Sequence, residues 1–513
     1  MGNTRDEIPA FLAEVRDAVM EDPGLPRNNP TVSLWQEPPH PTVASIQSTV
    51  LPQQTDFVVI GSGITGCSVT KTLLDQQPDI SETGKASHVT LLEARTLVSG
   101  ATGRNGGHLV TAAGHTYGEL ANDYGEETAK EITRFSIMNI DYILKMVRKM
   151  DPELQEYSQI RDVIKVMVAQ DAATWEASKK SVQDFQKAVE EYKTYHRIIE
   201  KGDLAERWNV KDGFGAIEHP AGAVWPYRLL TGIYARLLEK YPDRLSIEAN
   251  TPVTDITYDS VVHEYVNQYP YTVITPRGSI RARQVIHCTN AFASHLLSPL
   301  RGKVYPFRGT MSVQEASPTL NKGNFRSWSG MNQQSLDPET GMYKSGLFYL
   351  QQNAHTGDIW VGTEVSHLRD TLSSDDTYIS SDSWEELSKF LPNYFLGWGK
   401  AELGRIKGIW AGIQGHTTDG LPLVGKIPEK VTGRPGSTGE WIAAGFNGYG
   451  MDKCWLTGQA LAKMVLGQEV DEWFPKCYYI SEARVEQAMS MANLLSKFDA
   501  IPKTTQIPAK SKL

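Results

Sequence analysis

Glycines spaced as G-x-G-x-x-G follow a short apolar run near the start of the chain, a spacing typical of dinucleotide-binding turns. Residues 56–60 read DFVVI and predict a buried strand, and a helix with Leu73 on its apolar face is expected after the glycines. Residues 88–92 predict a second strand, which ends at the acidic Glu93. This order of strand, turn, helix, strand and acid is the context that makes the motif informative. The turn consists of Gly61, Ser62, Gly63, Ile64, Thr65 and Gly66.

The residue types of this turn match the needs of a phosphate-rich ligand. Gly61 permits a tight turn, Gly63 lets a pyrophosphate approach the backbone, and Gly66 allows close packing of helix and strand. The helix N-terminus faces the phosphate charge, and Glu93 can accept hydrogen bonds from a ribose diol. Glu93 lies beyond the usual spacing of about 20 residues, and a polar loop at 76–87 accounts for the difference. The alternative is an ordinary α/β crossover.

The composition is that of a soluble globular enzyme and argues against several other classes. At 513 residues the chain is too long for one simple core, so two intertwined domains are expected. A net charge of −9 without a Lys/Arg run argues against nucleic-acid binding. The four cysteines lack metal-ligand spacing, so we predict free thiols in a reducing compartment and no metal site. Neither a membrane span nor a secretory signal is predicted.

The last three residues, Ser511-Lys512-Leu513, match a peroxisomal address that an import receptor reads. They follow a tail at 504–510 that is rich in Lys, Thr and Pro. A merely solvated tail is the alternative. We therefore expect the protein to be located in the peroxisome. If the tripeptide is not an address, the expected location is the cytoplasm.

Most of the remaining chain alternates helices and strands. We expect an N-terminal helix at 8–20 and then a proline-rich arm at 23–52, which lies over the surface and in which Trp35 is a candidate anchor without a chemical role. Further helices are expected at 119–149, 171–195 and 384–395, and strands at 163–169, at 285–291 and on both sides of a turn at 356–357.

Two further glycine-rich segments predict close approach of backbone to a flat or phosphorylated ligand. Residues 99–108 read SGATGRNGGH, directly after the first fingerprint. Residues 441–451 read WIAAGFNGYGM, and a helix ending near Gly467 is expected after them. A DGLP turn at 419–422 precedes this third segment.

These three segments, in this order, resemble the D-amino-acid oxidase-like flavoproteins, which include glycine and sarcosine oxidases, dimethylglycine dehydrogenases and γ-glutamylputrescine oxidases. The ATGRNGG wording is most similar to the last group. The resemblance spans roughly residues 55–467 and implies FAD rather than NAD. The cofactor-binding residues that it implies, beyond the first turn, are Glu93, Ala94, Arg95, Ser99, Gly100, Ala101, Thr102, Arg104, Asn105, Gly106, Gly107, Val253, Thr289, Asn290, Ala291, Gly420, Leu421, Gly445, Asn447, Gly448, Tyr449, Gly450 and Met451.

The expected fold is α/β, with a Rossmann-like FAD-binding domain and a second, substrate domain built on a mixed β-sheet. The FAD domain is expected to be discontinuous, formed by residues 55–115, 206–300 and 405–480. Residues 116–205 and 301–404 would form the substrate domain. Residues 1–54 would form the N-terminal helix and arm, and residues 481–513 a C-terminal helix and tail.

The resemblance implies oxidation of a C–N bond in a primary or secondary amine or an N-substituted amino acid. Hydride would pass to flavin N5, the imine would hydrolyse, and O2 would take the electrons to give hydrogen peroxide. The protein's main tasks are then to position the substrate and to supply the electrostatic field around the flavin, so no catalytic triad is required. A flavin dehydrogenase with another electron acceptor and a non-catalytic FAD-binding protein are the alternatives.

Two departures from the family pattern bear on the substrate and on oxygen. Asp452 stands where sarcosine oxidases carry a lysine for the substrate carboxylate, which favours a cationic substrate. The alternative is that Asp452 only complements a helix N-terminus. Trp360 stands where those oxidases carry a lysine that promotes reaction with oxygen, which keeps the dehydrogenase alternative open.

Covalent attachment of the flavin is not expected. Arg104 occupies the position of the histidine that dimethylglycine dehydrogenases use, and residues 410–418 contain no cysteine where sarcosine oxidases have one. We therefore expect noncovalent FAD. The residues predicted to be catalytic are His108, Trp360, Trp410, Tyr449 and Asp452, and further pocket candidates are Tyr227, Tyr349, Glu364 and His416. The alternative for each is a packing or hydrogen-bonding role in the core.

Overall fold

The first glycine fingerprint lies at the centre of an eight-stranded mixed sheet in the computed structural model, which describes residues 9–76, 86–259, 268–318, 320, 323, 325–398 and 403–504. Strands β17, β18, β10, β1, β2 and β7 follow one another across the sheet, and β9 and β8 extend it from β10. The strand bounds are β1 Gln54–Ile60, β2 Val89–Leu92, β7 Leu245–Glu248, β8 Asp255–Tyr258, β9 Tyr271–Thr275, β10 Gly278–His287, β17 Leu423–Lys426 and β18 Glu440–Ala444.

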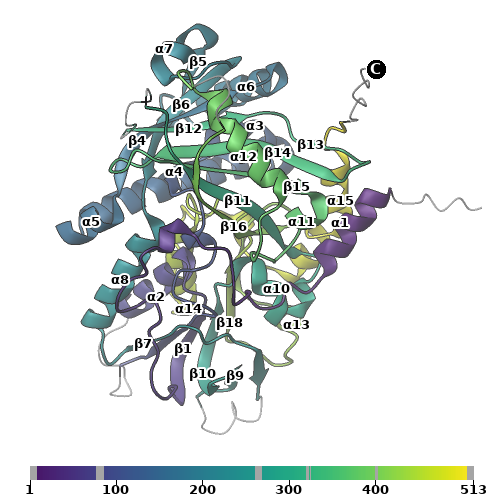
Figure 1. The fold of residues 1–513 in the computed structure, drawn as a ribbon. Helices are drawn as coiled ribbons and strands as arrows, with labels where there is room; N and C mark the ends of the chain where they lie inside the picture. The colour runs from purple at the N-terminus through teal and green to yellow at the C-terminus, as the bar shows by residue number, and fades with distance from the viewer. Residues whose placement is uncertain are drawn as a thin grey trace, which may run out of the picture.

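The centre of this sheet is parallel, because β1 pairs in parallel with both β10 and β2, and β10 with β18. Parallel strands need crossover helices, and buried parallel strands are apolar on both faces, as β1 and β2 are here. Helices α2 (Ile64–Gln76), α8 (Pro226–Lys240) and α14 (Cys454–Val465) pack together beside the sheet, as Figure 1 shows in its lower half. This arrangement confirms the predicted α/β class with a Rossmann-like unit.

A second, ten-stranded mixed sheet forms the upper half of the molecule (Figure 1). Its strands follow the order β16, β11, β15, β14, β12, β4, β6 and β3, with β13 beside β14 and β5 beside β6. The bounds are β3 His108–Leu109, β4 Arg161–Ala169, β5 Arg197–Glu200, β6 Gly215–Ala223, β11 Val304–Gln314, β12 Arg326–Met331, β13 Ser335–Leu336, β14 Met342–Gln352, β15 Ile359–His367 and β16 Ile406–Thr417.

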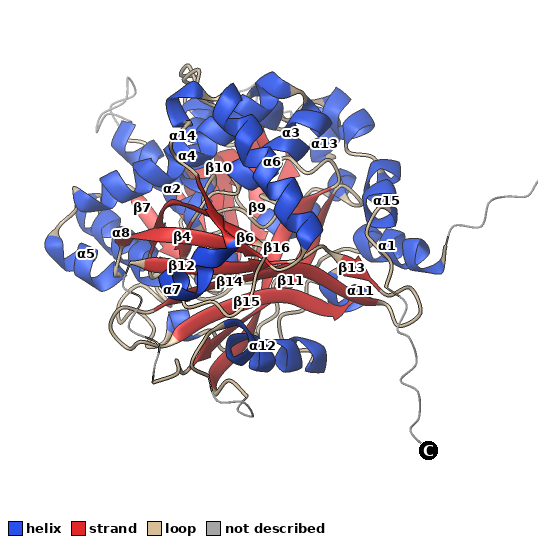
Figure 2. Ribbon diagram, turned by 90° about the horizontal axis from the view of Figure 1, so that it is seen from above, coloured by secondary structure: helices blue, strands red, loops and turns tan. Residues whose placement is uncertain are grey.

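Helices cover both faces of the second sheet. Figure 2 shows α3 (Ala113–Tyr124), α4 (Glu126–Arg148) and α6 (Ala172–Ala188) on one side and α12 (Ser381–Tyr394) on the other. The shorter helices are α1 Ala10–Met20, α5 Pro152–Ser158, α7 Leu204–Trp208, α10 Ala293–Leu296, α11 Leu368–Thr371, α13 Glu429–Thr432 and α15 Met491–Asp499. The face under α3 and α6 is the one that the cavity described below uses.

Two predicted helices are wrong in their extent. The helix expected at 171–195 ends as α6 at Ala188, before a 3-10 turn at Glu190–Tyr192. The pattern over 119–149 predicts a single helix, but α3 ends at Tyr124 and α4 begins at Glu126. Gly125 separates them with a φ of +88°, a conformation that glycine adopts without strain. The sequence carries this signal, since a lone glycine inside a helical pattern also marks a helix end.

The proline-rich arm is more deeply embedded than expected. Trp35 is only 2% exposed, and it stacks on Trp360 of β15 with ring centroids 3.6 Å apart. Asp22, the residue before the arm, pairs with Arg301 at 2.5 Å and with His295 at 3.0 Å. The arm is therefore part of the packed structure rather than a loose cover.

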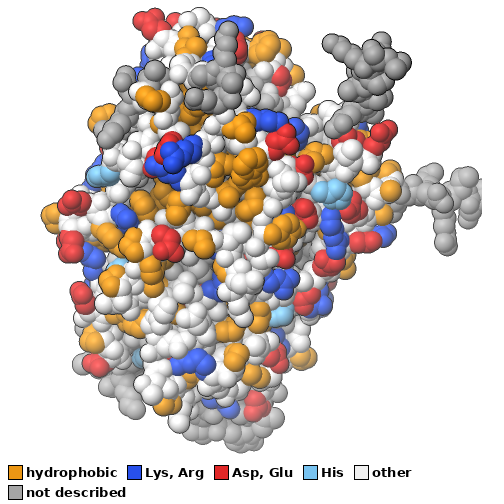
Figure 3. Space-filling model, viewed as in Figure 1, with side chains coloured by type: hydrophobic (Ala, Val, Ile, Leu, Met, Phe, Trp, Pro, Cys, Tyr) orange, Lys and Arg blue, Asp and Glu red, His pale blue; other side chains and the backbone are white. Residues whose placement is uncertain are grey.

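Acidic and basic side chains are interspersed on the face that Figure 3 shows, without a basic patch. None of the helices in the described part of the chain combines the length and apolar character that a membrane span needs. Within the same residues, no group of three or more His, Cys, Asp or Glu side chains could hold a metal ion. The Ser511-Lys512-Leu513 tripeptide lies outside the described residues.

Candidate active site

A cavity of about 910 Å³ extends from the glycine fingerprint in the first sheet to the helix-covered face of the second. Segments far apart in the chain line it together, including the three glycine turns and several other predicted residues. The predicted residues that line it are Gly61, Ser62, Gly63, Ile64, Thr65, Glu93, Ala94, Arg95, Gly100, Ala101, Thr102, Arg104, Asn105, Gly106, His108, Val253, Thr289, Asn290, Ala291, Tyr349, Glu364, His416, Asn447, Gly448, Tyr449, Gly450, Met451 and Asp452.

Other predicted residues lie behind the cavity wall rather than in it, namely Gly66, Ser99, Gly107, Tyr227, Trp360, Trp410, Gly420, Leu421 and Gly445. Trp410 is fully buried, and its Nε1 donates a hydrogen bond to the Arg104 carbonyl at 2.9 Å. Trp360 packs between Trp35 and Trp410. The structure therefore places these two tryptophans as supports of the second glycine turn, without direct access to a ligand in the cavity.

The first turn needs glycine at two positions for steric reasons. Gly61 has a φ of +105°, and a Cβ there would lie 2.6 Å from the Cys288 carbonyl oxygen. A Cβ on Gly66 would lie 1.9 Å from the Gly61 carbonyl oxygen. These contacts bring β1, α2 and the end of β10 together so closely that only hydrogen fits. Backbone at the start of α2 therefore borders the cavity, as a pyrophosphate site requires.

Glu93 organises the same end of the cavity. Its Oε2 accepts hydrogen bonds from the Ser62 backbone N–H at 3.0 Å and from the Ser62 hydroxyl at 2.6 Å. Its Oε1 accepts from the Arg95 backbone N–H at 3.1 Å. The carboxylate can accept further hydrogen bonds, since it has about four lone-pair sites. Val253, in the segment that follows β7, also lines the cavity.

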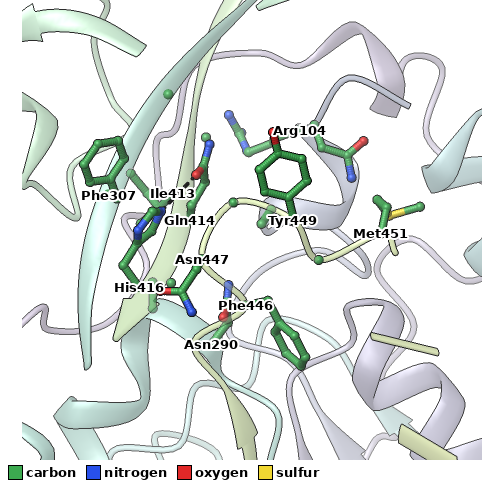
Figure 4. Close-up of a pocket in the computed structure, with 18 of the residues that line it drawn as sticks. Arg104, Asn290, Phe307, Ile413, Gln414, His416, Phe446, Asn447, Tyr449 and Met451 are labelled. Atoms are coloured by element: carbon green, nitrogen blue, oxygen red, sulfur yellow. Dashed lines mark hydrogen bonds between the residues drawn. The ribbon is translucent and has the colours of Figure 1, made fainter. Parts of the chain in front are cut away.

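Two asparagines attach the third glycine segment to the rest of the site. Asn290 and Asn447 both have positive φ, at +46° and +52°. Asn290 Oδ1 accepts a hydrogen bond from the Gly445 N–H at 3.0 Å, and Asn447 Oδ1 accepts from the Thr417 N–H at 2.9 Å. The loop after β18 is thereby held against the end of β16, and Figure 4 shows Asn447 and Tyr449 beside Gln414 and His416.

The N-terminal arm binds the second glycine segment from outside. Ser33 Oγ donates a hydrogen bond to the Gly103 carbonyl at 2.7 Å, and Trp35 Nε1 donates to the Asn105 carbonyl at 2.5 Å. The guanidinium of Arg104 is engaged with the arm and β16, where it donates to the carbonyls of Thr31 and Ala411. Burial lowers the pKa of Arg104 to about 10. Sequence patterns do not predict these contacts, because the arm has no periodic pattern.

The inner part of the cavity holds a buried acid. Glu364 Oε1 accepts hydrogen bonds from the Tyr349 hydroxyl at 3.1 Å and from Gln414 Nε2 at 3.0 Å, and Oε2 accepts from the Ser345 hydroxyl at 3.2 Å. Burial raises the pKa of Glu364, while these three donors oppose the shift. Gln414 is not among the predicted residues; its position on β16, between the Trp410 and DGLP segments, is the available signal.

His108 lies beside this group, with its ring centroid 6.2 Å from that of Tyr349. Its Nε2 is buried and has no hydrogen-bond partner within the described structure. Burial lowers the pKa of His108 well below its usual value, and Lys165 and Arg161 add to the shift. His108 is therefore a neutral imidazole with one ring nitrogen available to a ligand.

Asp452 is more fully paired than expected. Its Oδ2 accepts a hydrogen bond from the Ser136 hydroxyl at 2.6 Å, and its Oδ1 lies 2.7 Å from Lys453 Nζ. Burial raises the pKa of Asp452. Although Asp452 borders the cavity, Lys453 offsets its charge, so Glu364 is the acid better placed to act on a ligand.

The cavity continues beyond His108 between the second sheet and helices α3 and α6. Lys165 of β4, His115 of α3 and His219 of β6 line this arm of the cavity, and none of the three is among the predicted residues. Burial lowers the pKa of Lys165 to about 7. The sequence did not identify Lys165 as a cavity residue, because an alternating strand pattern does not show which face of the strand borders a cavity.

Comparisons with known proteins agree with this architecture. A family model described as FAD dependent oxidoreductase matches residues 56–464. Among solved structures, glycine oxidase from Geobacillus kaustophilus is similar with a TM-score of 0.61 at 18% identity, over 84% of this chain and 99% of that chain. The L-proline dehydrogenase from P. horikoshii has a TM-score of 0.61 at 19% identity, over 85% and 99%.

A third similar structure, L-amino acid deaminase from Proteus myxofaciens in complex with anthranilate, has a TM-score of 0.59 at 15% identity, over 89% of this chain and 97% of that chain. At these identities the solved structures establish the fold alone. A search of curated proteins finds no match.

Proposed function

Because the chain belongs to the family of FAD-dependent oxidoreductases, we propose that it oxidises the C–N bond of a primary or secondary amine or an N-substituted amino acid. The observation that carries this proposal is the continuous cavity, which joins the glycine fingerprint to the buried acid Glu364. One space can thus hold a dinucleotide cofactor and a small substrate in contact with each other.

The residues at the fingerprint end fit FAD. The first glycine turn and the start of α2 would hold the pyrophosphate, Glu93 the ribose hydroxyls, and the Val253 backbone the adenine. Gly106 and Gly448 line the cavity beside Tyr349 and Gln414, the partners of Glu364, and the flavin ring would lie there. When bound, FAD supplies a hydride acceptor at its N5 atom.

We propose that FAD is held noncovalently. Arg104 is engaged with the arm, and the described cysteines that border the cavity, Cys288 and Cys454, are poor nucleophiles because burial raises the pKa of both thiols. Cold trichloroacetic acid precipitation should leave all yellow colour in the supernatant. A yellow pellet would contradict this part of the proposal.

The residues at the substrate end can prepare an amine for oxidation. An amine enters as an ammonium ion at neutral pH and must lose a proton before hydride transfer. Glu364 is placed to accept that proton. Its raised pKa is closer to neutral pH than the pKa of an ordinary carboxyl, which suits a general base. Tyr349 and Gln414 would orient the carboxyl through the hydrogen bonds described above. Once oxidised, the substrate is an imine, which hydrolyses in water.

O2 is the proposed electron acceptor, and its two-electron reduction gives hydrogen peroxide. A dehydrogenase that uses another acceptor is the second candidate, because the neutral indole of Trp360 packs against Trp35 and offers no cation there. Stopped-flow reoxidation by air separates the two. A rate far below turnover would favour the dehydrogenase.

An anaerobic bleaching screen tests the proposed function. Amines, amino acids and N-methyl compounds are mixed with the FAD-loaded protein without oxygen, and loss of the flavin absorbance is recorded. At least one compound should bleach the flavin within seconds to minutes. If none does, the protein is better described as a non-catalytic FAD-binding protein.

Peroxisomal delivery through Ser511-Lys512-Leu513 is also part of the proposal. A fluorescent protein fused to the N-terminus should colocalise with a peroxisomal marker. Deletion of these three residues should make the signal diffuse, and an unchanged pattern would contradict the assignment.

A further inference from the structure

Lys165 is a buried lysine that faces the cavity without an acidic partner among the described residues. It is 5% exposed, and its Nζ donates one hydrogen bond to the Trp328 carbonyl. Among the residues that the structure describes, no carboxylate forms an ion pair with it, and burial alone lowers its pKa. An ammonium has three donors, so the Trp328 carbonyl leaves two without a partner.

The two histidines beside Lys165 in the cavity are neutral. His219 is its cross-strand partner, and the His219 Nδ1 hydrogen bonds to the Pro220 carbonyl at 2.9 Å. Because a carbonyl only accepts, Nδ1 carries the proton and Nε2 is the free acceptor. Burial lowers the pKa of His115 to about 4 and that of His219 to about 3. Lys165 is therefore the basic side chain that lines this end of the cavity, while Arg161 lies near His108 outside the lining, and Glu119 is the acid of α3 that lines the cavity.

Buried charges are ordinarily paired, because desolvation of an isolated ion is costly. A purely structural lysine would carry an acid partner or reach solvent, and Lys165 does neither. His108, at the start of this arm and beside Tyr349, leaves its buried Nε2 without a partner in the described structure. Two unsatisfied polar groups that border one cavity indicate a ligand atom that accepts hydrogen bonds and carries negative charge.

The distance from Glu364 limits what this ligand can be. Lys165 lies on β4 and Glu364 on β15, and β12 and β14 separate these strands. Three strand spacings amount to about 14 Å across the sheet. The register places Lys165 level with Trp360, so Glu364 lies four residues farther along β15, which adds an offset of about 13 Å along the strands. The amino and carboxylate groups of an α-amino acid are joined through a single carbon, so it cannot contact both residues. The anionic group must be remote from the reacting nitrogen.

We propose that Lys165, with His108, forms a subsite for a carboxylate at the far end of an amine substrate whose nitrogen lies near Glu364. A carboxylate is favoured over a phosphate, because one lysine supplies a single positive charge. The inference rests on the proposed amine oxidation, and it names the substrate class as amines with a distal carboxylate.

The test compares 8-aminooctanoate and 6-aminohexanoate with octylamine and hexylamine as reductants of the FAD-loaded protein. The aminocarboxylates should reduce the flavin with a lower half-saturating concentration, by about 10- to 100-fold, as a charge-assisted hydrogen bond predicts. Lys165→Met should abolish this preference, while the alkylamines should still reduce the flavin of the variant. Lys344→Met is the matched control, since Lys344 lies on the same sheet, is exposed and pairs with Glu386.

A binding measurement keeps the two proposals distinguishable. Octanoate should perturb the flavin absorbance of wild type and of Lys344→Met, but not of Lys165→Met, and octylphosphonate should bind more weakly than octanoate. An alkylamine that reduces the flavin as well as its aminocarboxylate would overturn the subsite while amine oxidation stands. If no amine reduces the flavin, the oxidation proposal fails, and octanoate binding that depends on Lys165 would still support the anion site.

Discussion

Replacing Asp376 by asparagine is expected to destabilise the protein by about 3–5 kcal/mol, the cost of breaking a buried ion pair on one side. Asp376 Oδ2 lies 2.8 Å from Arg95 Nη1 and 3.8 Å from Arg104 Nε. The three side chains are 3%, 8% and 2% exposed, so solvent does not replace the lost charge. The amide of the introduced asparagine could still accept a hydrogen bond, so the loss is that of the counter-charge for two buried guanidinium groups.

The effect should extend to cofactor binding. Arg95 Nη2 and Arg104 Nε both donate to the Ser99 carbonyl, at 3.0 and 2.9 Å, and Ser99 begins the second glycine segment. Without the carboxylate of Asp376, no negative charge offsets the repulsion between the guanidinium groups of Arg95 and Arg104 at this position. The dissociation constant for FAD should therefore rise together with the loss of stability.

Urea unfolding followed by tryptophan fluorescence measures the stability, and titration of apoprotein with FAD measures the affinity. Glu191→Gln is the control, because Glu191 pairs with Arg134 at the surface, with side chains 50% and 44% exposed. An exposed pair contributes about 0–1 kcal/mol. If Asp376→Asn lowers the stability no more than this control does, the reasoning from buried charge is refuted.

Four further outcomes are expected. Gly66→Ala should yield protein without flavin, measured by its visible absorbance, because the new Cβ would meet the Gly61 carbonyl at 1.9 Å; full flavin content would contradict this steric argument. Trp35→Ala should lower the unfolding free energy by about 3–5 kcal/mol and release FAD faster, and an unchanged FAD release rate would show that the arm does not hold the cofactor turn. Glu364→Gln should slow anaerobic flavin reduction by about 100-fold, as loss of a general base predicts, whereas a wild-type rate would exclude that role. Stability should rise from about pH 7 to about pH 10, because the pKa of Lys165 is about 7 when folded and about 10 when unfolded; Lys165→Met should flatten this rise in urea titrations, and a parallel profile would contradict the assignment.

Local patterns were sufficient for the parts of the site that are made of backbone. The first turn was predictable because a tight turn, a close phosphate approach and helix packing each demand glycine at a set position, as Gly61 and Gly66 show. The same holds for the strands around it, since the buried part of a parallel strand is a nearly continuous apolar run, as residues 57–60 are. The sequence also contains the signal for the helix break at Gly125, because a lone glycine in a helical pattern can mark a helix end.

Tertiary structure alone decided which side chains face the cavity. Lys165 and Glu364 line the same cavity because β4 and β15 belong to one sheet. The alternation of side chains along a strand shows which residues share a face, but it does not show which strands are neighbours. Trp360 and Trp410 were expected in the site and lie behind its wall, since adjacency to a flavin turn in sequence does not fix the direction of a side chain. The chain by itself thus determined the cofactor class and the turns that bind it. The charge proposed to select the substrate depends on long-range pairing, which no local pattern encodes.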